Sequence, residues 1–171
     1  MEDELLDLVN AQDEVIGTIL RSQAYAEKRL YQLRAVWLVI KNEDGKFWIP
    51  KRSATKKNSP NYLDGSTVGH VSSGETYEQS MIREVAEELQ FDISAMPYRL
   101  VGKLTPAIGS VSFVEVFELC VPNDFVINYN QQDFSEFFWL SAQEIVNLYQ
   151  QGQKMRTTLV SIMKNFYGAH E

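Results

Sequence analysis

The chain has 171 residues, 44% hydrophobic and 23% charged, with a formal net charge of −7; these values predict one folded domain over residues 1–171 and exclude a disordered protein. The negative charge argues against non-specific binding to nucleic acid, which needs a basic surface, but permits a phosphorylated substrate held through a divalent cation. With one cysteine, no long apolar run and no basic leader, the sequence excludes a disulfide scaffold and a membrane-spanning protein, and we expect a cytoplasmic one.

Residues 1–30 are expected to form an N-terminal hairpin and a connector. Two short apolar segments flank the polar turn Asn10–Asp13, which predicts a pair of strands within residues 5–21. Residues 22–33 then predict a helix or an irregular connector, with Ser22 as the candidate N-cap.

A second hairpin is predicted for residues 35–52, whose two apolar segments flank a turn at Asn42–Gly45. The polar residues 53–67 contain Pro and Gly and predict a loop. Lys51 and Arg52 lie where the strand enters this loop. They are candidate substrate-binding residues because cationic side chains hold phosphate, a guanidinium with two hydrogen bonds; the alternative is a merely solvated basic loop.

The central stretch predicts a helix that carries three glutamates on one face. At roughly 100° per residue, Glu87 and Glu88 fall about 60° and 40° to either side of Glu84. The apolar residues expected on the opposite, buried side have the i, i+3, i+4, i+7 spacing of a helix stripe: they are Ile82, Val85, Ala86 and Leu89.

The three glutamates repel one another, because like charges three or four residues apart destabilise a helix by roughly 0.2–0.5 kcal/mol per pair. Arg83 offsets part of this cost from its position four residues before Glu87. A Mg²⁺ or Mn²⁺ ion would remove the conflict, since Mg²⁺ binds carboxylate oxygens and keeps waters or phosphate oxygens as its other ligands. Glu84, Glu87 and Glu88 are therefore candidate metal ligands; the alternative is a solvated acidic face.

The loop before this helix strengthens the metal hypothesis. Gly69 and Gly74 allow close backbone approach or unusual dihedral angles. Glu75 lies at the start of the helix, where the helix dipole favours an acid.

Beyond the central helix, residues 99–121 predict two strands around Pro106–Gly109. Cys120 lies in the second of them and is expected to be buried. Phe137–Leu140 predict a short buried strand.

Two helices are predicted at the end of the chain. Ser141 with Glu144 three residues later forms a capping box that opens the first, and Gly152 ends it. Residues 155–169 have apolar side chains at helical spacing and predict the second. This mixture of hairpins and helices predicts a layered α+β or α/β domain with a mixed sheet.

The segment from Gly69 to Phe91 resembles the Nudix box, G-x₅-E-x₇-R-E-U-x-E-E-x-G-U, in which U is a bulky apolar residue. Gly69, Glu75 and the run Arg83–Glu88 match its fixed positions. Gln90 is the one departure, because the box has glycine there. It lies at the helix exit, where αL geometry is readily adopted by Gly or Asn, and it leaves every acidic position intact.

The resemblance implies the Nudix fold, an α+β domain built as an α/β/α sandwich with a mixed central sheet flanked by helices, here with an added N-terminal β-hairpin. It implies metal-dependent hydrolysis of a diphosphate linkage in a small nucleoside diphosphate-type substrate. Glu84, Glu87 and Glu88 would bind the metal, and Glu84 or Glu87 would also assist the attacking water. Arg83 would act in the catalytic unit by bracing the loop and helix together with Glu75.

The resemblance implies further site residues outside the helix. His70 would lie near the substrate phosphates, and the carbonyl of Val68 could add a metal ligand. Family members often use one more acid from elsewhere in the chain, for which there are four candidates: Asp133, Glu136, Glu115 and Glu118.

The flanks of the box also resemble the Nudix branch related to isopentenyl diphosphate isomerase, in residues 4–17, in residues 51–64 and at the Gly69-His70 pair. Isomerase activity is the alternative that this suggests. It is disfavoured because Val68 replaces the catalytic cysteine of the isomerase, and Tyr31 and Gln32 stand where it has further histidines. A non-catalytic nucleotide-binding domain is a third hypothesis, against which the intact acidic set argues.

Overall fold

The computed structural model describes residues 3–171 as eight strands, four α-helices and two 3₁₀ turns. The strands are β1 (Leu5–Val9), β2 (Val15–Leu20), β3 (Arg34–Asn42), β4 (Phe47–Arg52), β5 (Thr67–His70), β6 (Arg99–Leu104), β7 (Phe113–Val121) and β8 (Phe134–Leu140). The helices are α1 (Arg21–Ala26), α2 (Tyr77–Leu89), α3 (Ala142–Gln150) and α4 (Thr157–Tyr167), and the 3₁₀ turns are η1 (Leu30–Gln32) and η2 (Pro106–Ile108).

The main sheet is mixed, as the sequence predicts. Its strand order is β6-β7-β3-β4-β8, and β5 pairs with the first half of β3. β3 and β7 run parallel along their whole lengths, and the other pairs are antiparallel. β1 and β2 form a separate antiparallel hairpin, which confirms the expected N-terminal element.

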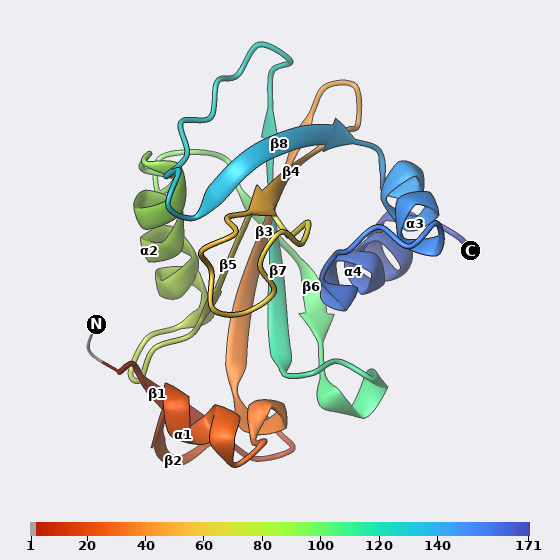
Figure 1. Ribbon diagram of the computed structural model, residues 1–171. Coiled ribbons are helices and arrows are strands. Elements are labelled where there is room, and N and C mark those ends of the chain that lie inside the picture. The colour runs from red at the N-terminus through yellow and green to blue at the C-terminus, as the bar shows by residue number, and fades with distance from the viewer. Residues whose placement is uncertain (1–2) are drawn as a thin grey trace.

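The sheet lies between two helical layers (Figure 1), with α2 on one face and α3 with α4 on the other. Side chains alternate along β3, so one strand supplies both cores. Val36, Leu38 and Ile40 pack toward α2. Trp37 and Val39 pack toward α3 and α4. This is the α/β/α arrangement that the sequence predicts. No helix in the described part of the chain has the length and apolar character needed to cross a membrane.

Asp13, in the turn of the N-terminal hairpin, fastens that hairpin to the main sheet. Its carboxylate accepts hydrogen bonds from Arg34 at 2.6 Å and Tyr77 at 2.9 Å, and it also contacts Lys103. The hairpin therefore sits against β3, α2 and β6 together. The predicted cap of the following helix is wrong, because α1 begins at Arg21 after Leu20, and the Ser22 hydroxyl bonds to Asp3 instead.

The buried stripe of α2 differs in part from the predicted one. Val85 and Leu89 are fully buried, but Ile82 is only partly covered and Ala86 is exposed. Tyr77 and Met81 complete the buried stripe. The stripe is rotated because β5 packs beside the glutamate face, so that face is not the solvent side of the helix. A capping box between Thr76 and Gln79, which the sequence analysis did not identify, starts the helix.

Three residues predicted to be buried lie on strands as expected but are exposed. Phe137 and Phe138 are 42% and 39% exposed, because β8 is the edge strand of the sheet. Cys120 is exposed because the pairing of β6 with β7 ends at Glu118, before that position. The capping box of Ser141 and the two C-terminal helices are confirmed.

Gln90 ends α2 in the left-handed conformation, with φ of 60° and ψ of 31°. A residue with a Cβ is strained there by roughly 1–2 kcal/mol, whereas glycine is not. Gln90→Gly should therefore raise the free energy of unfolding by about 0.5–1 kcal/mol, after the larger entropy of an unfolded glycine is subtracted. Chemical denaturation measures this change. Gln90→Ala, which keeps the Cβ, should give no such gain, and an equal gain would show that left-handed strain is not the cause.

Candidate functional site

The candidate site is built on β5, where successive side chains point to opposite faces. Gly69 and Thr67 face α2, whereas Val68 packs toward α3 and α4. The absence of a side chain at Gly69 lets Glu84 lie directly on the strand. A Cβ at Gly69 would lie 2.6 Å from Cγ of Glu84 and closer still to its carboxyl group. Glycine is thus required here by close approach, because its backbone angles are not left-handed.

Glu88 lies one helical turn further along the same groove between α2 and β5. It accepts a hydrogen bond from the hydroxyl of Thr67. Thr67 was not among the predicted site residues, although its position two residues before Gly69 places it on the same face of an extended strand.

Burial changes the protonation of both glutamates. Burial raises the pKa of Glu84 to about 7, although the charge of Arg83 acts in the opposite direction. Burial and the charge of Glu84 raise the pKa of Glu88 to about 8. Burial thus disfavours the charged form of both acids, and for Glu84 it outweighs the opposing effect of the single nearby arginine, Arg83.

Arg83 links the helix to the preceding loop. Its Nε lies 3.0 Å from Oε1 of Glu75, and its Nη1 lies 2.8 Å from Oε1 of Glu84. Burial opposes the charge of Arg83, but these carboxylates raise its pKa overall. Glu75, held also by the hydroxyl of Ser80, lies just before the helix, and its pKa is lowered despite burial by its bonds to Arg83 and Ser80. Arg83 therefore braces the loop and helix.

The backbone of β5 leaves carbonyl groups free at its outer edge. Val71 donates its N–H to the carbonyl of Arg34 at 3.0 Å, and hydrogen-bonded and non-hydrogen-bonded pairs alternate along antiparallel strands. The carbonyls of His70 and Val68 consequently point away from β3. That of His70 accepts a bond from Nη2 of Arg83 at 3.4 Å. The Val68 carbonyl thus points to the same outer edge of β5, as the prediction that it is a metal ligand requires.

The three candidate substrate-binding residues already have partners inside the protein. Lys51 pairs with Glu136 at 2.9 Å. Arg52 bonds to Asp64 at 2.9 Å and to backbone carbonyls of the 53–67 loop. His70 lies on the face of β5 away from the glutamates, where its Nε2 is 3.1 Å from the hydroxyl of Tyr25.

Of the four candidates for an additional acid, Asp133 interacts electrostatically with one of the glutamates of α2. Its charge raises the pKa of Glu88, and it is bound by Lys56. Glu136 is paired with Lys51. The other two lie in ion pairs on β7: Glu115 with Lys103, and Glu118 with Arg99 and Lys41.

In the described part of the chain, the acidic side chains do not converge on a single point. Within residues 3–171, no group of three His, Cys, Asp or Glu side chains stands ready to enclose a metal ion. Glu87 accounts for part of this, because its side chain is 59% exposed and meets only Arg83, at 3.6 Å. The donor set nevertheless fits a hard divalent cation, because it consists of three carboxylates, and two of them, Glu84 and Glu87, share one arginine, Arg83.

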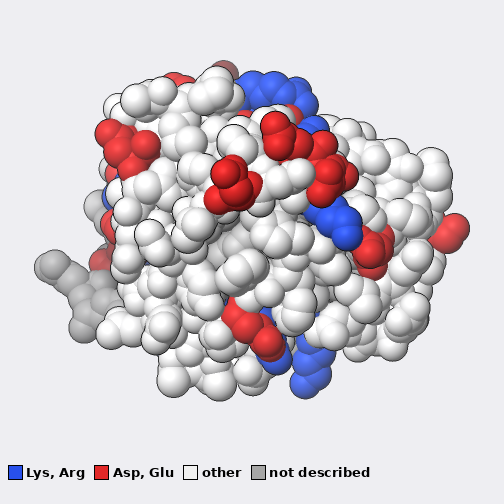
Figure 2. Space-filling model, turned by 90° about the horizontal axis from the view of Figure 1, so that it is seen from above, with Lys and Arg blue, Asp and Glu red and all other residues white. Residues whose placement is uncertain are grey.

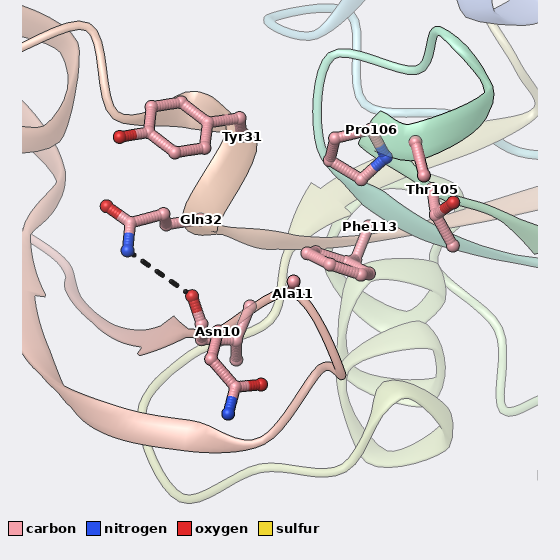
Figure 3. Close-up of a pocket in the computed structure, with 9 residues that line it drawn as sticks. Asn10, Ala11, Tyr31, Gln32, Thr105, Pro106 and Phe113 are labelled. Atoms are coloured by element: carbon pink, nitrogen blue, oxygen red, sulfur yellow. Dashed lines mark hydrogen bonds between the residues drawn. The ribbon is translucent and has the colours of Figure 1, made fainter.

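A small pocket of about 190 Å³ lies elsewhere, between the hairpin turn and η2. Figure 3 shows Tyr31 and Gln32 on one side of it and Pro106 and Phe113 on the other, with Gln32 donating to the carbonyl of Val9 at 3.4 Å. No acid or histidine lines this pocket. Tyr31 and Gln32, the residues at the positions of the isomerase histidines, therefore belong to a largely apolar cavity.

The surface around β8 and the 122–133 loop is mostly uncharged. Figure 2 looks down on this end of the molecule and shows acidic side chains in separate groups, with few basic ones among them. Seen from this side, the described residues form no continuous basic surface of the kind that nucleic-acid-binding proteins use.

Comparison with known proteins gives consistent results. Residues 31–161 match the NUDIX domain. An uncharacterized Nudix hydrolase of Nostoc sp., all7351, is 41% identical over 98% of both chains. The crystal structure of DR0079 from Deinococcus radiodurans superposes with a TM-score of 0.89 at 36% identity, covering 96% of this chain and 99% of that one. The MutT protein of Methanosarcina mazei shares the fold at 19% identity, with a TM-score of 0.62 over 80% of this chain and 93% of its own.

Gly69→Ala should displace the Glu84 side chain from β5, because the added Cβ overlaps it. Overpacking of this kind costs about 1–3 kcal/mol in the free energy of unfolding, measurable by chemical denaturation. Gly17→Ala is the matched control, since a Cβ there meets nothing within 4 Å. Equal effects of the two substitutions would contradict the close approach.

The metal-free protein should lose stability as pH rises. The folded pKa values of Glu84 and Glu88 lie above the ordinary value of 4.5, so the folded state holds more protons than the unfolded one. The stability that these two protonated carboxyl groups contribute is fully present below pH 4.5 and is lost as pH rises through about 7 to 8.

We expect a fall of roughly 2 kcal/mol in unfolding free energy between about pH 6 and about pH 8 in the presence of a chelator. Glu88→Gln, which keeps a partner for Thr67, should flatten this profile. Glu78→Gln, an exposed change on the same helix, should leave it unaltered. A wild-type profile that rises over this range would show that the two acids ionise freely.

Proposed function

Because the chain belongs to the Nudix hydrolase family, we propose that it hydrolyses the diphosphate linkage of a small nucleoside diphosphate-type substrate with Mg²⁺ or Mn²⁺. The observation that carries this proposal is the pair Glu84 and Glu88, held between α2 and β5 with pKa values raised by burial. Buried carboxylates are costly for a fold, and Arg83 offsets part of this cost at Glu84; a bound cation is the partner that would remove the rest.

Glu84, Glu87 and Glu88 would hold the metal, with the Val68 carbonyl as a further oxygen ligand. When bound, such an ion polarises a phosphoryl oxygen and lowers the pKa of a coordinated water. Glu87 is the most exposed of the three glutamates, so it can turn toward the others without displacing a packed neighbour. Asp133 is the best candidate for the additional acid, because its charge acts on Glu88.

The protein's own residues would move the proton and fix the geometry. Glu84 or Glu87 would accept the proton of the attacking water, a role that needs an ionised carboxylate. Arg83 keeps Glu84 on the strand through the 2.8 Å bond and ties the helix to Glu75 in the loop. We assign Arg83 to positioning, because its donors are directed at protein acceptors.

The isomerase alternative receives less support. His70 would have to act beside the glutamates, but it lies on the other face of β5 against Tyr25. Val68 offers a carbonyl and an apolar side chain, with no thiol. Incubation with isopentenyl diphosphate, followed by a search for the allylic product, tests this alternative directly.

A release assay would identify the substrate class. The panel comprises nucleoside di- and triphosphates, nucleotide sugars, dinucleotides and coenzyme A, each with Mg²⁺ or Mn²⁺. Metal-dependent release of phosphate or a nucleotide from one class supports the proposal. No turnover on the panel, together with no Mg²⁺ binding by calorimetry, would favour a non-catalytic binding domain.

Glu84→Gln and Glu88→Gln should each lower metal-dependent turnover by at least about 100-fold, because each removes a charged metal ligand and Glu84 is also a candidate base. The neutral amides have nearly the same volume, so circular dichroism should show an intact fold. Glu78→Gln serves as the control on the same helix. Wild-type turnover by both variants would refute the assignment.

A further inference from the structure

Two arginines stand apart from the rest in the described chain. The sequence has seven arginines, and the side chains of five donate a hydrogen bond to a protein acceptor: Arg29, Arg34, Arg52, Arg83 and Arg99. Arg21 and Arg156 donate none. Each meets one carboxylate beyond hydrogen-bond distance, Arg21 with Glu4 at 3.8 Å and Arg156 with Asp64 at 3.7 Å.

Arg21 and Arg156 come from opposite ends of the sequence to the same side of β5. Arg21 begins α1, where its guanidinium lies 5.8 Å from the ring of Tyr25, and the Tyr25 hydroxyl contacts His70. Arg156 caps α4, and its guanidinium lies 5.7 Å from the ring of Trp37.

The pairing of β3 with β5 connects these two contacts. Trp37 lies opposite Val68, and Ala35 lies opposite His70, so all four side chains share the sheet face that is turned away from α2. Burial and the positive charges of both arginines lower the pKa of His70 to about 4. Both guanidiniums therefore lie close enough to act on the same imidazole.

Each arginine also pairs with a carboxylate whose charge acts on one of the candidate metal-binding glutamates. Glu4, the loose partner of Arg21, receives a hydrogen bond from Ser72, and its charge raises the pKa of Glu84. Asp64, the loose partner of Arg156, is held at 2.9 Å by Arg52, and its charge raises the pKa of Glu88. Arg21 and Arg156 are thus linked to the acidic groove through Glu4 and Asp64, respectively.

We propose that Arg21 and Arg156 bind an anionic group of the substrate, a phosphate that lies beyond the linkage to be cleaved. This inference rests on the proposed function, because it concerns the part of the same substrate that the metal would not bind. A guanidinium offers five N–H donors in a planar fork that fits phosphate oxygens, and among residues 3–171 no protein acceptor lies within hydrogen-bond distance of these donors.

Stability alone gives little reason for this arrangement. Exposed ion pairs contribute a median of about 0–1 kcal/mol even in direct contact, and these two are longer than a hydrogen bond. The side chains are 44% and 33% exposed, so an incoming phosphate can reach both. The aromatic rings beneath them favour a fixed guanidinium orientation before the ligand arrives.

The chain has only two histidines, His70 and His170, so imidazole NMR reports this region cleanly. Pyrophosphate titrated without metal into the intact protein should shift the His70 signals saturably and leave those of His170 unmoved. Arg21→Gln and Arg156→Gln should each weaken the apparent affinity about tenfold, as expected for a lost charge-assisted bond. Arg29→Gln, the control on the segment after α1, should bind as the wild type does.

Turnover then separates this inference from the proposed function. On any hydrolysed substrate that carries a second phosphate, both variants should raise KM with little change in kcat, because the lost contact is made equally in ground and transition states. Arg156→Lys should recover only part of the affinity.

Two results would overturn the inference. One is a wild-type His70 signal that ignores pyrophosphate or moves equally with chloride at the same ionic strength. The other is normal KM in both variants of an active enzyme. An inactive enzyme whose His70 still responds to pyrophosphate would instead refute the hydrolase proposal and leave the anion site standing.

Discussion

The groove between α2 and β5 holds two carboxylates, Glu84 and Glu88, whose burial raises their pKa values, and the rest of the candidate site depends on this constraint. Glu84 can lie on the strand only because Gly69 has no side chain. Glu88 depends on a hydroxyl at Thr67. Isolated buried charges are strongly disfavoured, so the groove persists because Arg83 compensates one side of it. A divalent cation is the natural complement on the other side.

The sequence predicts those parts of the site that depend on local geometry. The spacing of Glu84, Glu87 and Glu88 sets their common face at a fixed angle per residue, whatever the helix packs against. The left-handed conformation of Gln90 follows in the same way from its place at a helix end. The hairpins and the C-terminal helices also have local turn and cap signals, so most of the fold could be predicted.

The remaining features depend on which segments meet in space. The buried stripe of α2 is rotated because β5 covers the flank that carries the glutamates. Phe137 and Cys120 have buried-strand sequences, yet one lies on an edge strand and the other beyond the end of a neighbour. Lys51 and Arg52 are basic in a promising loop, but acids more than ten residues away neutralise them. Arg21 and Arg156 carry no local signal at all.

The separation of these two arginines along the chain has a consequence for biosynthesis. The glutamates belong to the middle of the sequence, whereas Arg156 starts the final helix and Arg21 follows the first hairpin. Chains emerge from the ribosome N-terminus first, so the acidic groove and the first arginine are made before the second. A nascent or truncated chain that lacks α4 would contain the three candidate metal-binding glutamates but only one of the two arginines that we propose bind phosphate. The proposed phosphate site would then be complete only once α4 has been synthesised.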